Sequence, residues 1–189
     1  MIPRNHAPGM DDAEPYLPAT DMPRFIRDMM EFVGMSEADV AAIGRSAPIV
    51  LRHEAALTSA LYDHFVKFPR SAVFFLGPDG AVDTVRIERR KHSLGRWLRE
   101  TAQVALTSEF SYYVLSVALA HGHREQPPGA IPQHLVVGAM SLTQSALAAI
   151  FAAELGAEEA VAASVAWNKL LLVQLSVFML AYVSPRRVL

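Results

Sequence analysis

A histidine at the end of an apolar helix face is the residue with the clearest chemical potential in this sequence. The segment from Phe110 to His121 predicts a helix, and Phe110, Val114, Val117 and His121 share one face because their spacings are four, three and four residues. An imidazole in that place could be an axial ligand to the iron of a flat, apolar haem. The alternative is a hydrogen-bonded core histidine, and the stripe alone does not decide between them.

His123 is the alternative candidate for the axial ligand. Two residues along a helix turn about 200° around its axis, so His121 and His123 cannot face the same iron. Only His121 lies on the apolar stripe, and we expect His123 to meet solvent or a haem propionate. A ligating His121 must be neutral, with its second nitrogen donating to a carbonyl about one turn earlier, near Val117 and Ala118.

Tyr62 is the second candidate for chemistry, because it shares a helix face with Ala55, Thr58 and Phe65. The hydroxyl of such a tyrosine either bonds to a core carbonyl or donates to a ligand. A hydrogen bond from the hydroxyl to a ligand with partial negative charge would contribute about 1.5–3 kcal/mol.

Composition limits the class of protein. The 189 residues, 52% of them hydrophobic, suit one globular domain large enough to enclose a cofactor. The net charge of -2 gives no reason to expect nucleic-acid binding. The absence of cysteine excludes disulfides, iron–sulfur clusters and thiolate zinc sites, and it favours the cytoplasm.

No targeting or membrane segment is expected. The amino terminus has no apolar signal core. The most apolar run, Leu170 to Val183, has 14 uncharged residues, whereas a membrane span needs about 20. We therefore predict a buried core or interface helix there.

The remaining pattern predicts an all-α chain with seven or eight helices. Residues 1–20, rich in proline, should form an irregular arm, and residues 21–189 one domain. Asp21 and Ser36 are predicted helix caps, Pro48 should kink or divide the second helical stretch, and Gly156 should stop the next to last helix. The predicted helices span 24–33, 37–68, 82–105, 108–123, 132–155 and 157–183, with a turn at 77–80.

Several motifs together resemble protoglobins and the globin domains of globin-coupled sensors. They are the Tyr62 segment Leu61–Pro69, Pro78-Asp-Gly80, Arg96-Trp97-Leu98, Val117–Arg124 with the later Pro132, and Trp167 with Lys169. The proline-rich arm is similar to the extra amino-terminal segment of protoglobins. The resemblance covers most of the chain.

The resemblance implies a globin fold that holds haem b. His121 would be the proximal ligand, Tyr62 the distal residue that faces bound gas, and Leu94 the apolar residue over the distal face. Phe65 and Val117 would also contact the haem. Two residues depart from archaeal protoglobins, since Leu61 replaces a tryptophan and Leu94 a phenylalanine, which puts the shape of the distal pocket in doubt.

The implied function is reversible binding of O₂, CO or NO, by a sensor, carrier or scavenger. One alternative is a haem enzyme that turns over NO or peroxide, and another is a haem-free, globin-like dimerisation module. If the protein signals, we expect its output either in a separate protein or in a segment beyond the given sequence. We also expect a homodimer through the last two helices, in which Val173, Val177 and Leu180 offer apolar surface.

A run of basic residues precedes the candidate proximal helix. It consists of Arg86, Arg89, Arg90, Lys91, Arg96 and Arg99. Such a run is usually a solvated helix face, although one or two members could bind haem propionates, for which arginine is suited. Spacing does not select among them. Trp97, within the run, is expected to pack in the core or at an interface.

Overall fold

The protein is built from α-helices, as the sequence predicts. The computed structural model describes residues 16–103, 108–123 and 129–183. Within these ranges the helices are α1 (Met22–Phe32), α2 (Glu37–Arg52), α3 (Glu54–Lys67), α4 (Pro69–Ala72), α5 (Thr84–Ala102), α6 (Ser108–Gly122), α7 (Gln133–Glu154) and α8 (Ala157–Leu180). Two short 3-10 helices, η2 (Pro18–Thr20) and η3 (Val73–Phe75), complete the described elements.

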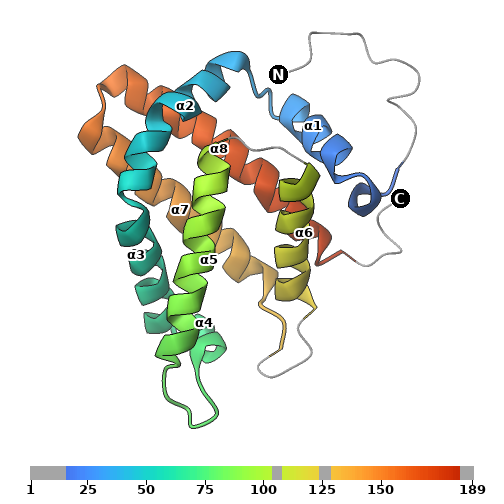
Figure 1. The fold of residues 1–189 in the computed structure, drawn as a ribbon, viewed down its shortest axis with the longest axis vertical. Helices are drawn as coiled ribbons and strands as arrows, with labels where there is room; N and C mark the ends of the chain where they lie inside the picture. The colour runs from blue at the N-terminus through green and yellow to red at the C-terminus, as the bar shows by residue number, and fades with distance from the viewer. Residues whose placement is uncertain (1–15, 104–107, 124–128, 184–189) are drawn as a thin grey trace.

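The two longest helices form the centre of the arrangement. In Figure 1, α7 and α8 lie side by side and cross behind α3, α5 and α6. Helix α2 packs against α8, and α3 packs against α5. One core cluster joins α2, α3, α5, α7 and α8 around the buried Trp167 and Phe151, and a second joins α1, α6 and α8 around Val114 and Val173.

Two helix starts follow the predicted caps. The Asp21 side chain accepts a hydrogen bond from the backbone N–H of Arg24 at 3.1 Å. Ser36 and Asp39 form a reciprocal capping box, in which each side chain accepts from the other residue's backbone N–H. The turn at 77–80 is also present, because the N–H of Gly80 donates to the carbonyl of Gly77 at 3.0 Å.

The second helical stretch is not divided at Pro48, as the sequence analysis had allowed. The second helical stretch is divided, but at His53, and Pro48 lies inside α2. A proline removes the hydrogen bond to the carbonyl four residues earlier, which belongs to Gly44. Gly44 and Pro48 are both exposed, so water can reach that carbonyl and the helix continues.

The connection between α7 and α8 differs from the prediction. Gly156 does not end α7 in a left-handed conformation; its φ is -63° and its ψ 153°, and it is the N-cap of α8. Leu155, also extended, ends α7. Two extended residues thus reverse the chain, and no positive φ is needed. The predicted arm lies outside the described residues up to position 15, and η2 shows that its last part is helical.

The apolar residues of α8 are distributed differently from the expectation. Val173 and Val177 are fully buried within the protomer, where they belong to the second core cluster. They cannot offer surface to a second copy. Leu180 is half-buried against the same cluster. The exposed large apolar side chains of the last two helices are Val137, Val161, Val165 and Leu172.

Helices α7 and α8 are each long and apolar enough to cross a membrane by length and composition. Half of the most apolar stretch of α8 is buried inside the protein, and α8 packs on α1, α2, α6 and α7. A core helix passes the same test, so length and composition are weak evidence for a span.

Candidate functional site

One pocket, of about 390 Å³, lies between the helices that carry the predicted site residues. This volume is within the range of small-molecule sites, about 300–1,000 Å³. Residues from α3, α4, η3, α5, α6, α7 and α8 line it, and most are apolar. The lining residues are Leu61, Tyr62, Phe65, Ser71, Phe74, Phe75, Arg90, Ser93, Leu94, Trp97, Tyr113, Val114, Val117, Ala120, His121, Ile131, Leu135, Val136, Ala139, Met140, Thr143 and Phe178.

His121 lies at one side of the pocket in the last turn of α6. Its Nδ1 is 2.7 Å from the carbonyl oxygen of Val117. A carbonyl only accepts, so Nδ1 carries the proton and donates, and the lone pair of a neutral ring is on Nε2. The hydrogen bond lies where the sequence predicted it, one turn back, and it fixes the ring's tautomer.

The surroundings of His121 keep the ring neutral. Burial lowers its pKa below the ordinary value, and the positive charge of Arg90 acts in the same direction, against the hydrogen bond to Val117. The edge of the ring meets Phe178 of α8 with centroids 5.6 Å apart. A neutral imidazole with a free Nε2 is the form that can bind a metal. His123 is exposed and does not line the pocket.

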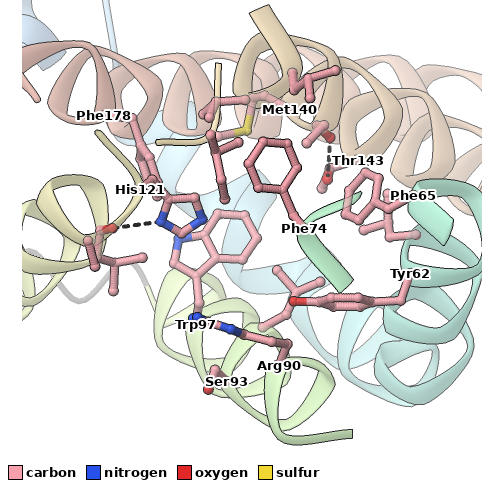
Figure 2. A pocket seen from close by; sticks show the side chains of 18 of the residues that line it. Tyr62, Phe65, Phe74, Arg90, Ser93, Trp97, His121, Met140, Thr143 and Phe178 are labelled. Atoms are coloured by element: carbon pink, nitrogen blue, oxygen red, sulfur yellow. Dashed lines mark hydrogen bonds between the residues drawn. The ribbon is translucent and has the colours of Figure 1, made fainter. Parts of the chain in front are cut away.

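Tyr62 faces the pocket from α3, on the side opposite His121, with the ring of Phe74 between them in Figure 2. Phe65 and Phe75 pack edge-on against its ring, with centroids 5.7 and 5.6 Å away. Burial raises the pKa of the hydroxyl to about 12, with the charge of Arg90 opposing. The hydroxyl is therefore protonated at neutral pH, and no other described residue hydrogen-bonds to it. It is a donor available to a ligand.

The five residues predicted to bind a cofactor all meet at this pocket. They are His121, Tyr62, Leu94, Phe65 and Val117. The sequence analysis missed the α7 side of the pocket, formed by Leu135, Val136, Ala139, Met140 and Thr143. The spacing of these five residues places them on one face of α7, so the helical period of the sequence could have grouped them. The period does not indicate which part of the protein that face contacts.

Trp97 also lines the pocket, where the sequence analysis expected only packing. Its indole Nε1 donates to the Oε1 of Gln174 at 2.6 Å, and Gln174 is buried in α8. The Nε2 of Gln174 donates in turn to the hydroxyl of Thr101 at 3.1 Å. The tryptophan is thus held by a polar contact between α5 and α8, while its ring closes the pocket near His121.

The pocket offers one imidazole and no multidentate metal site. Among the described residues there is no group of three or more His, Asp or Glu side chains that could hold a metal ion. A metal in this pocket would have to arrive within an organic group that supplies the other ligands. The apolar walls, the free Nε2 of His121 and the donor at Tyr62 fit haem in chemistry.

The comparisons with known proteins agree with this assignment of fold. Residues 23–187 match the family model of Protoglobin, and the chain therefore belongs to the protoglobin family. Comparison with curated proteins gives no significant match.

Two solved globin domains have a similar structure. The globin domain of the Geobacter sulfurreducens globin-coupled sensor is 16% identical, with a TM-score of 0.70 over 84% of this chain and 97% of that one. The ferric globin domain of E. coli DosC is 14% identical, with a TM-score of 0.65 over 83% of this chain and 99% of that one. At these identities the likeness shows the fold, which is a globin fold.

Proposed function

We propose that the pocket holds haem b with His121 as the axial ligand, and that the protein reversibly binds the diatomic gases O₂, CO and NO. The observation that carries the proposal is the geometry of His121 in a member of the protoglobin family. Nδ1 is committed to the carbonyl of Val117, so Nε2 is the nitrogen left for the pocket.

Haem would supply an iron that binds diatomic gases. The residues of the chain would then act in distinct ways. His121 would anchor the iron from one side, and its bond to Val117 would keep the ring from turning. Tyr62, from the opposite side, would donate to a gas ligand with partial negative charge. Leu94 and Phe65 would exclude water from that ligand.

The same arrangement supports reversible binding rather than dedicated turnover. Within the described residues that line the pocket, no histidine other than His121 is present to act as a distal acid or base. The Tyr62 hydroxyl lies across the pocket from His121 in Figure 2, and its high pKa makes it a poor proton donor. A role as sensor, carrier or scavenger would follow from such binding.

We also propose a homodimer formed by α7 and α8. Val161, Val165 and Leu172 of α8 are exposed and share one face because they lie four and seven residues apart. Val137 of α7 is exposed as well. Two antiparallel helices that each leave apolar side chains in water suit a four-helix bundle with a second copy.

The absorption spectrum of the purified protein tests the haem proposal. We expect a Soret band that shifts when the reduced protein is exposed to CO and returns when CO is removed. A protein that carries no haem after expression with ample haem supply would refute the proposal and favour a haem-free module. Consumption of NO in the presence of a reductant, at rates above a free haem control, would favour the enzyme instead.

A further inference from the structure

The open side of the pocket carries a positive charge. Among the described lining residues, only Arg90, Ser93 and Ala120 are exposed, so the pocket opens to solvent between α5 and α6. Arg90 is the one arginine or lysine of that lining, and the lining includes no aspartate or glutamate. The apolar interior of the pocket therefore opens to solvent beside the positive charge of Arg90, with no acidic side chain in the lining to neutralise it.

Arg90 has no acid within reach along its own helix. The residues three and four positions away on either side are Arg86, Ile87, Ser93 and Leu94. Three nearby basic residues form ion pairs: Arg86 with Asp83 at 3.2 Å, Lys91 with Glu88 at 3.0 Å, and Arg96 with Glu100 at 2.7 Å. Arg89 instead donates to the backbone carbonyl of Val85 at 3.5 Å. In the part of the chain that the structure describes, Arg90 makes no ion pair or side-chain hydrogen bond.

The charge of Arg90 acts on both sides of the pocket. Burial raises the pKa of Tyr62 and lowers that of His121, and Arg90 lowers both. Its guanidinium is therefore close to the pocket interior, as the stick view of its side chain beneath Tyr62 and Trp97 also indicates (Figure 2). Arg90 and Tyr62 both offer hydrogen-bond donors to the pocket, and neither has an acceptor among the described side chains.

We propose that Arg90 is an anion-binding residue at the mouth of the pocket, where its guanidinium pairs with a carboxylate-type oxyanion. Arginine presents two parallel N–H groups that match such an anion. The inference rests on the proposed function, because the anion would belong to the pocket's occupant or bind beside it.

Two kinds of molecule could supply an oxyanion that binds Arg90. An amphipathic group that places its apolar body between α3, α6 and α7 must leave its charged edge at the opening, and haem carries two carboxylates at one edge. A small free oxyanion such as nitrite could instead enter past Ser93 and reach the same guanidinium. The first source suits the exposed position of Arg90 better, and the experiment separates the two.

The test compares Arg90→Gln and Arg90→Lys with the matched control Arg89→Gln. Arg89 is the next residue of α5, is exposed, and does not line the pocket. Each full-length protein is loaded with haem or with haem dimethyl ester, which lacks the carboxylates. The rate of transfer to an excess of acceptor apoglobin is measured at low and high salt, and the ferric haem protein is titrated with nitrite by absorbance.

If Arg90 holds the haem carboxylate, Arg90→Gln speeds haem transfer at low salt about three- to fivefold, the size of an exposed ion pair. The ester-loaded proteins then transfer at equal rates, and Arg90→Lys and Arg89→Gln resemble the wild type. If the anion is instead a free oxyanion, haem transfers at the same rate from the wild type and all variants. The affinity for nitrite then falls about three- to fivefold in Arg90→Gln and stays unchanged in the other variants.

Equal transfer rates together with equal nitrite affinities would overturn the assignment of Arg90 while leaving the haem site intact. A wild-type protein that takes up no haem would overturn both proposals. The two failures are therefore distinguishable, and the salt dependence adds a separate check, because a charge pair at the opening weakens as ionic strength rises.

Discussion

Replacing Tyr62 with phenylalanine removes one hydroxyl from the pocket and leaves the packing of the ring. The ring is held edge-on by Phe65 and Phe75, which both contact it through carbon. No described residue depends on the hydroxyl for a hydrogen bond, so Tyr62→Phe creates no unpaired donor or acceptor in the protein. The variant should therefore fold and load haem like the wild type.

The magnitude follows from the bond that is lost. The hydroxyl is protonated at neutral pH because burial raises its pKa to about 12. A hydrogen bond from it to partly negative O₂ is charge-assisted and contributes about 1.5–3 kcal/mol. At about 1.4 kcal/mol for each factor of ten, the O₂ dissociation rate should rise roughly ten- to a hundredfold in Tyr62→Phe.

The assay is stopped-flow or flash-photolysis measurement of O₂ and CO dissociation at neutral pH. The CO rate should change far less, because CO carries less charge. Tyr112→Phe is the matched control, since its exposed hydroxyl donates to the carbonyl of Thr20, away from the pocket. Equal changes for both gases in Tyr62→Phe, or none for either, would refute a hydrogen bond from Tyr62 to O₂.

Two further predictions concern assembly and stability. Leu172→Glu places a charge on the exposed face of α8, so light scattering should show a folded monomer. Val177→Glu buries the charge inside the protomer and should unfold it. A Leu172→Glu variant that is still dimeric would contradict the proposed interface. Burial opposes ionisation of Asp39, but hydrogen bonds from Lys169 and Ser36 outweigh it and hold its pKa below the usual value. A carboxyl with a lowered pKa stabilises the fold above its unfolded-state pKa and loses this contribution in acid. Asp39→Asn should therefore lower the free energy of unfolding by about 1–2 kcal/mol at pH 7. The difference in unfolding temperature between the wild type and the variant should shrink below about pH 4. A difference that stays constant with pH would contradict this prediction.

Local signals predicted where helices begin better than where they end. Asp21 and Ser36 bond to backbone groups within three residues, so their effect is set by the sequence itself. The break at His53 has no such local signal, because the His53 side chain makes no capping hydrogen bond to α3. Gly156 could have ended α7, but the chain reverses with an extended Leu155 and needs no left-handed residue.

The candidate site was predicted from residues that share a helix face with His121 or Tyr62, together with the family resemblance. Residues that reach the pocket from other elements were missed. Phe178 meets His121 across 57 positions of sequence (178 − 121), and Trp97 is oriented by Gln174 of α8. Such contacts depend on how helices cross, which periodicity within one helix does not contain. The sequence could not distinguish Arg90 from its basic neighbours, because only the packing of the helices determines that Arg90 lines the pocket.

The absorption spectrum of His121→Ala, measured beside His123→Ala, tests the central claim most directly. His121 supplies the free Nε2 in the pocket, whereas His123 is exposed and outside it. We predict that His121→Ala loses most of its haem, that added imidazole restores part of the Soret band, and that His123→Ala has a normal spectrum. A normal Soret band in His121→Ala, with loss of haem in His123→Ala, would contradict the assignment of the axial ligand.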